Sequence, residues 1–116
     1  MNTYPDLHLY IDGQWRQTAD PNPVLDPATE DAIGRLPQAA QSDLDDALEA
    51  AEKGFRTWRK TPPAERASVL LKAAALMRER QEEIATAITA EHGKPLPQAR
   101  LEVIRGCEFF EWDAGE

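Results

Sequence analysis

Apolar residues recur at helical spacing along the second half of the chain. From Ala64 to His92 the sequence contains neither proline nor glycine, and apolar positions return every three, four or seven residues, as on one face of an α-helix. Prolines at positions 62 and 63 suit a first helical turn, and Gly93 followed by Pro95 is typical of a helix end. We therefore predict one long amphipathic helix, bent near Gln81. Its apolar face contains Val69, Leu70, Ala73, Leu76, Met77, Ile84 and Ile88.

Two further segments show the same spacing. Ser42 is a favourable capping residue, and Asp45 stands three residues later, where a capping box places its second side chain. A helix is therefore expected from Ser42 to about Trp58, and another from Gln98 to about Ala114. The apolar faces of these two helices consist of Leu44, Ala47, Leu48, Ala51, Phe55 and Trp58, and of Leu101, Val103, Ile104, Cys107, Phe110 and Ala114.

The first part of the chain carries strand patterns instead. In Leu7–Ile11 aliphatic residues alternate with His8 and Tyr10. Leu7, Leu9 and Ile11 would therefore share one face of a strand. Asp12-Gly13 is a strong signal for a two-residue hairpin turn, and Gln14–Arg16 returns as the partner strand. Short extended segments are also expected at Val24-Leu25 and at Ala32–Leu36.

These patterns predict the α+β class. An N-terminal β-hairpin and short strands occupy residues 1–40, and three amphipathic helices follow in residues 41–116. The length of 116 residues suits one small domain or a piece of a larger one. With 41% hydrophobic and 29% charged residues, the composition is that of a folded globular chain rather than a disordered one.

The charge balance narrows the possible partners. With 21 acidic and 13 basic side chains, the formal net charge is -8, which argues against a nucleic-acid binder because such a protein needs a basic face. No apolar run is long enough to span a bilayer, and no polybasic patch suits an anionic membrane. The single cysteine and the lack of a secretory signal pattern lead us to expect a cytoplasmic location.

Few residues are spaced for chemistry. The six glycines form neither a dinucleotide-binding fingerprint nor a phosphate-binding loop. The sequence has no Cys-x-x-Cys and no helical pair of histidines that could bind zinc. His8 is expected on an exposed strand face, and His92-Gly93-Lys94 is expected to end a helix. Cys107 lies on an apolar helix face, where burial disfavours the reactive thiolate. The residues therefore predict no catalytic and no cofactor-binding side chain in this chain.

Several short motifs nevertheless follow one another in a characteristic order. They are Tyr10–Trp15, Asp26–Glu30, Pro63–Arg66, Glu91–Pro95 and Ala99–Val103. In this order they resemble the N-terminal portion of the aldehyde dehydrogenase superfamily, in which Glu91–Pro95 is similar to a Glu-Thr-Gly-Lys-Pro signature. Glu108–Trp112 resembles the semialdehyde branch, such as succinate-semialdehyde and α-ketoglutarate-semialdehyde dehydrogenases.

This resemblance implies a fragment of an α/β aldehyde dehydrogenase fold. Complete members use NAD or NADP to oxidise a small aldehyde to a carboxylic acid, and their nucleophilic cysteine, general-base glutamate and Rossmann segment match no position here. The resemblance therefore implies a non-catalytic scaffold that binds no cofactor alone, with the Rossmann completion and the catalytic domain absent. Its partners would be the rest of the enzyme chain or further copies in a homo-oligomer.

The resemblance also implies a candidate site for a monovalent cation. Many complete members hold Na⁺ or K⁺, and the ligands carried over by position are the main-chain carbonyls of Val24 and Leu25 and the carboxylate of Glu102. Oxygen ligands suit such hard cations. The alternative is that Glu102 forms a surface ion pair with Arg105.

A function of a different class remains open. The apolar helix faces would equally suit a non-catalytic helical module that binds a partner protein. In either case these faces exceed what so small a body can cover, and we expect the isolated chain to be poorly folded or to self-associate.

Overall fold

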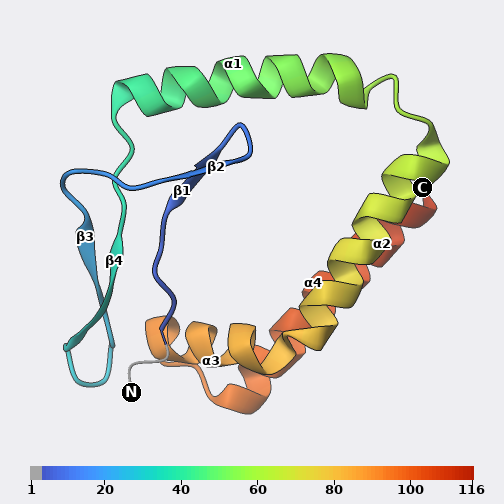
Figure 1. Ribbon diagram of the computed structural model, residues 1–116. Coiled ribbons are helices and arrows are strands. Elements are labelled where there is room, and N and C mark those ends of the chain that lie inside the picture. Colours follow the sequence, from blue (N-terminus) through green and yellow to red (C-terminus); the bar gives the residue numbers. More distant parts are fainter. Residues whose placement is uncertain (1–3) are drawn as a thin grey trace. The chain divides into compact units, whose positions relative to one another are not determined.

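The computed structural model describes residues 4–116, which form two compact units, residues 4–60 and Thr61–Glu116 (Figure 1). The first unit contains the strands and one helix, and the second contains three helices. The α+β class is confirmed, with strands first and helices after.

The first unit begins with the predicted hairpin. Strands β1 (Leu9–Ile11) and β2 (Gln14–Arg16) pair antiparallel, with Tyr10 opposite Trp15. Asp12 and Gly13 have φ values of 49° and 78°, as a turn with two left-handed residues requires. β1 begins at Leu9 rather than at Leu7, because its partner strand offers only three residues for pairing.

A second antiparallel pair follows in the same unit. β3 (Asn22–Leu25) pairs with β4 (Ala32–Leu36), and the register shifts between Val24 and Leu25. β3 is longer than the predicted Val24-Leu25 segment, since it also includes Asn22 and Pro23. Proline is tolerated there because one edge of each strand in a two-stranded ribbon makes no ladder hydrogen bonds.

Helix α1 (Gln41–Trp58) packs against β1. The predicted cap was wrong by two positions, because the helix is capped at Ala40 and not at Ser42. Asp43 stands three residues after Ala40, and its Oδ2 accepts a hydrogen bond from the Ala40 N–H at 2.9 Å. The acidic half of a capping box is therefore present, supplied by Asp43 rather than Asp45.

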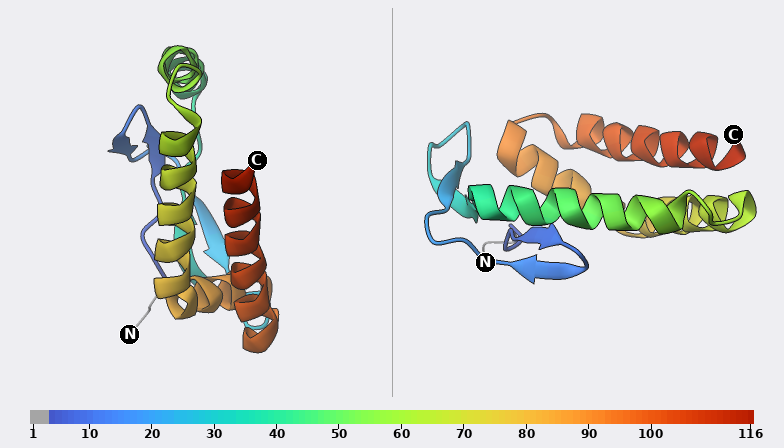
Figure 2. Two further views of the ribbon diagram at one scale, coloured as in Figure 1. Left: turned by 90° about the vertical axis from the view of Figure 1, so that its right-hand side faces the viewer. Right: turned by 90° about the horizontal axis from the view of Figure 1, so that it is seen from above.

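The second unit consists of α2 (Pro63–Glu79), α3 (Gln81–His92) and α4 (Leu96–Gly115). Figure 2 shows α2 and α4 side by side and running in opposite directions. Both α2 and α3 also pack on α4. The predicted helix ends are confirmed at Pro63, in the first turn of α2, and at Gly93, which has φ 74° after α3.

The prediction of one long helix was wrong, and residues 4–116 contain four helices where three were expected. Arg80, with φ -97° and ψ 17°, ends α2 and precedes α3. Its N–H still bonds to the Leu76 carbonyl and its carbonyl accepts from Ile84, both at 3.0 Å. The interruption thus lies beside the predicted bend, and it allows Ile84 to pack against the same core as α2.

Small side chains form the core of the second unit. Ala74, Ala85 and Ala99 are at most 1% exposed, and Val103 and Cys107 complete the buried cluster. Two bidentate ion pairs join the helices at its edge. Arg78 of α2 donates to both oxygens of Glu111 in α4 at 2.8–3.1 Å, and Arg100 of α4 donates to Glu82 of α3 at 2.7 and 2.8 Å. α4 begins at Leu96, two residues before the predicted start, with Pro97 in its first turn, where the missing N–H costs no helical hydrogen bond.

Candidate functional site

The carboxylate of Glu102 has a cationic partner that the sequence did not indicate. α3 ends at Gly93, and the turn through Lys94 and Pro95 leads into α4. This turn brings the Lys94 ammonium onto Glu102 Oε2, where it donates a hydrogen bond within an ion pair. That hydrogen bond and the charge of Lys94 hold the pKa of Glu102 below its ordinary value, with smaller contributions from His92 and Arg105.

The predicted alternative, a surface ion pair between Glu102 and Arg105, is therefore wrong about the main partner, which is Lys94. Arg105 contributes only a weak charge effect. A helical sequence pattern indicates only neighbours three and four residues apart on the same helix. Lys94 lies eight residues away and meets Glu102 only because the chain turns between the two helices.

Val24 and Leu25 end β3 in the first unit, directly before a tight loop. Asp26 organises this loop: its Oδ1 accepts from the Ala28 N–H at 2.7 Å, and its own N–H donates to the Asp31 carbonyl at 2.9 Å. The loop conformation is therefore set by its own hydrogen bonds.

The candidate cation ligands belong to different units, Val24 and Leu25 to the first and Glu102 to the second, and the joint site remains a prediction. Among residues 4–116, histidine, cysteine and acidic side chains form no group of three or more that could hold a metal ion.

Cys107 lies wholly inside the core of the second unit. Its exposed fraction is 0%, and it shares the buried cluster with Ala74 and Val103. The packing role that the sequence predicted for this thiol is confirmed. A reagent or substrate would need the helices to separate before it could reach the sulfur.

A cleft of about 450 Å³ lies in the first unit, lined by residues that precede β1, residues that follow β2, and residues of β4 and its C-terminal end. His8 borders it and shares a hydrogen bond of 3.1 Å with Gln17, while its Nδ1 lies 3.3 Å from the Asp6 carbonyl. The prediction for His8 was wrong in detail, because it precedes β1 and is half-buried. A Cβ on Gly34 would approach the ring of Tyr4 to 2.4 Å, so only glycine fits beneath that ring.

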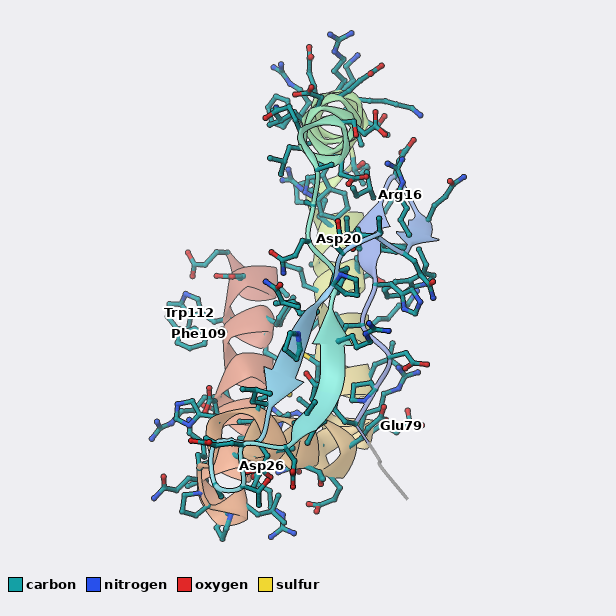
Figure 3. The ribbon with its side chains drawn as sticks, turned by 90° about the vertical axis from the view of Figure 1, so that its left-hand side faces the viewer. Arg16, Asp20, Asp26, Glu79, Phe109 and Trp112 are labelled. Carbon is teal, nitrogen blue, oxygen red and sulfur yellow. The ribbon has the colours of Figure 1, made fainter. Side chains whose placement is uncertain are left out.

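The outer face of α4 carries two large exposed aromatic side chains. Phe109 and Trp112 are 70% and 69% exposed, and Figure 3 shows both projecting from the helix. Arg105 and Glu108 complete a shallow apolar depression of about 330 Å³ with them. Helical spacing predicts that Phe109 lies outside the core face of α4, but the pattern gives no signal for a depression on this side.

Across the part of the chain that the structure describes, no helix combines the length and apolar character needed to cross a membrane.

The fold and the buried thiol agree with the resemblance that the sequence motifs indicate. The comparison with known families decides whether the chain belongs to that family. The model of the aldehyde dehydrogenase family matches residues 15–116. The chain belongs to the aldehyde dehydrogenase family. It represents an N-terminal portion of that family's fold.

Individual relatives agree with this assignment. Malonate-semialdehyde dehydrogenase 2 of Geobacillus kaustophilus is 41% identical over 111 residues, covering 94% of this chain and 23% of that protein. Succinate-semialdehyde dehydrogenase [NADP(+)] of Saccharomyces cerevisiae is 39% identical over 108 residues, covering 92% and 22%. The crystal structure of an aldehyde dehydrogenase from Brucella melitensis biovar abortus 2308 superposes with a TM-score of 0.91 at 32% identity, covering 94% and 23%. The chain thus spans about a quarter of the length of the curated relatives that it matches.

Proposed function

We propose that this chain is the N-terminal scaffold part of an NAD(P)-dependent semialdehyde dehydrogenase and is not catalytic by itself. The match of residues 15–116 to the aldehyde dehydrogenase family carries this proposal. The names of two relatives support the substrate class, since both act on a short aldehyde that also bears a carboxylate. The complete enzyme would oxidise the aldehyde to a carboxylic acid and pass a hydride to NAD or NADP, in the cytoplasm.

The role of this chain in such an enzyme would be mechanical. The ion pairs Arg78–Glu111 and Arg100–Glu82 join three helices around a core of small residues, which gives a body of defined shape. The exposed aromatic side chains Phe109 and Trp112 offer apolar surface to the rest of the enzyme chain or to another subunit. Cys107 would support packing, and the nucleophile would come from elsewhere.

A chimeric enzyme tests this proposal. We would replace the matching 111 residues of the Geobacillus malonate-semialdehyde dehydrogenase with this chain and measure NADH formation from malonate semialdehyde. The chimera should retain activity, whereas the purified chain alone should form no NADH or NADPH. The same chimera carrying Cys107→Ala should remain active, because that thiol is buried in the core.

Two results would contradict the scaffold role. Turnover by the purified chain would show that it is catalytic. A chimera that folds, as judged by its melting curve, but has no activity would favour a separate role as a helical protein-interaction module.

The monovalent cation site is a second, smaller part of the proposal. The carbonyls of Val24 and Leu25 and the carboxylate of Glu102 would hold Na⁺ or K⁺ in the complete enzyme. In this structure the Lys94 ammonium already balances the Glu102 carboxylate, so a bound cation would have to displace it or share the carboxylate.

The test uses a complete homologous enzyme. Replacing the residue that matches Glu102 with glutamine should weaken the stabilisation by K⁺, measured as the melting temperature during a K⁺ titration. An unchanged K⁺ response would remove Glu102 from the site and leave it as the partner of Lys94.

A further inference from the structure

Only one aspartate of this chain directly precedes a glycine. The sequence has nine aspartates, and Asp12 is followed by Gly13, whereas the others are followed by leucine, proline, alanine or aspartate. The side-chain carboxyl carbon of an aspartate can close a five-membered ring onto the amide nitrogen of the next residue. Glycine hinders this nitrogen least because it has no Cβ. Asp12-Gly13 is therefore the pair in this chain with the lowest steric barrier to ring closure.

The hairpin turn leaves both reacting groups available. Ile11 pairs with Gln14, so the strand ladder closes outside the turn and the Gly13 N–H contributes no ladder hydrogen bond. Within residues 4–116 and apart from the neighbours in the chain, a Cβ added at Gly13 would have only Tyr10 Oη near it, at 4.0 Å. The space around the Gly13 backbone is therefore open. The Asp12 side chain is 58% exposed, so it can rotate toward that backbone.

The contacts that hold this turn are weak. Asp12 Oδ2 lies 3.5 Å from the Nζ of Lys53, whose side chain is 73% exposed, and ion pairs between exposed groups contribute little. β1 and β2 each have three residues and form a two-stranded sheet of their own, an arrangement that is marginally stable. Short exposed elements of this kind open locally more often than a packed core does. Opening of the turn gives Asp12 the rotations that ring closure requires.

We propose that Asp12 is a site of spontaneous modification, where aspartate converts to isoaspartate. The Gly13 nitrogen loses its proton and bonds to the side-chain carboxyl carbon of Asp12, while the bond from that carbon to the carboxyl hydroxyl breaks and water leaves. Water then opens the resulting succinimide. Addition at the side-chain carbonyl restores aspartate, and addition at the main-chain carbonyl leaves the chain running through the side-chain carbon, as isoaspartate. One water is released and one is taken up, without oxidation or reduction, and no partner is needed.

Isoaspartate changes the hairpin that contains it. It adds one carbon to the main chain inside a two-residue turn, whose geometry depends on the positive φ values of Asp12 and Gly13. The register that sets Tyr10 opposite Trp15, with ring centroids 4.6 Å apart, should therefore be lost. The modification thus acts on the pairing of β1 with β2 and not only on a surface charge.

Ageing of the 116-residue chain in warm neutral buffer tests the proposal. Peptide mapping by mass spectrometry follows every aspartate, and an isoaspartate-specific methyltransferase with labelled S-adenosylmethionine marks the product. The methyl label should accumulate in the peptide that contains Asp12, and the succinimide should appear there as a mass lower by one water. Asp31 is the internal control: it is also exposed, but it precedes Ala32, and it should stay unlabelled over the same period.

Two substitutions at the same position give opposite expectations. Asp12→Glu keeps the carboxylate but would need a six-membered ring, so the label should be lost. The chain already accommodates a glutamate in the left-handed region, since Glu30 has φ 64°, and far-UV circular dichroism verifies that the variant keeps its helix content. Asp12→Asn should accumulate the label faster, because ammonia leaves an amide more readily than water leaves a carboxyl group.

A synthetic peptide of residues 9–16 separates the effect of the fold from that of the sequence. Label in the peptide but none in the folded chain would show that the hairpin protects Asp12, and it would overturn the proposal. Equal labelling of Asp12 and Asp31, or label that persists in Asp12→Glu, would overturn it as well. In the labelled chain the near-UV circular dichroism of the Tyr10–Trp15 pair should decrease, and an unchanged spectrum would refute the expected loss of strand pairing.

Discussion

Removing two methyl groups from the core of the second unit should reveal how much that small core contributes to stability. Val103 is 3% exposed and packs among Ala74, Ala99 and Cys107. Val103→Ala loses about 1.6 kcal/mol of transfer free energy, at about 0.8 kcal/mol for each methyl group, and leaves a small cavity that adds to the loss. We expect a decrease of about 2–3 kcal/mol in the free energy of unfolding. That is a large fraction of the total stability of a small unit.

The chain offers a matched control for this change. Val69→Ala alters the same atoms on α2, but Val69 is 53% exposed, and its replacement should cost less than about 0.5 kcal/mol. Urea unfolding followed by far-UV circular dichroism compares the two variants, with the slope expected to stay constant while the midpoint falls. If the chain alone lacks a cooperative transition, the same pair is compared in the chimeric dehydrogenase. Equal losses for both variants would refute the assigned core.

Three further results are expected. The hydrogen bond from Arg100 lowers the pKa of Glu82. The pair therefore stabilises the fold above the ordinary carboxyl pKa of about 4.3, and this contribution is lost as pH falls through the lowered pKa of Glu82. In thermal melts, Glu82→Gln should reduce the loss of stability at acid pH. Cys107 should react with a thiol reagent only slowly until denaturant opens the helices, and fast reaction in the native state would contradict its burial. Gly93→Ala should lower stability by about 1–2 kcal/mol because φ is 74°, whereas Gly54→Ala, inside α1 with open space around it, should raise stability by up to about 1 kcal/mol.

Features set by neighbouring residues could be predicted from the sequence. Asp12 and Gly13 form the hairpin turn because both adopt positive φ, and Gly93 ends α3 for the same reason. The apolar spacing placed Val103 and Cys107 on the buried side of α4. In each case the determining interaction lies within a few residues of the chain, which is the range over which a sequence pattern is informative.

Features set by packing between helices could not be predicted in the same way. The interruption at Arg80 has no proline or glycine to mark it, and it serves the contact of Ile84 with the core. The pairing of Glu102 with Lys94 depends on the turn between α3 and α4. The cleft beside His8 likewise needs segments that lie far apart in the sequence. The cation site, which would draw on both units, stays a prediction for the same reason.

The apolar side chains of the second unit are distributed unevenly between its core and its surface. Its core is built around alanines that are at most 1% exposed, while Phe109 and Trp112 on α4 are about 70% exposed. A self-sufficient domain buries its largest apolar side chains, because they contribute most of the hydrophobic free energy. Small core residues instead allow close helix crossings, which the ion pair between Arg78 and Glu111 reinforces. The second unit is therefore held together by small side chains and ion pairs, and the large aromatic side chains Phe109 and Trp112 lie outside the core that holds it together.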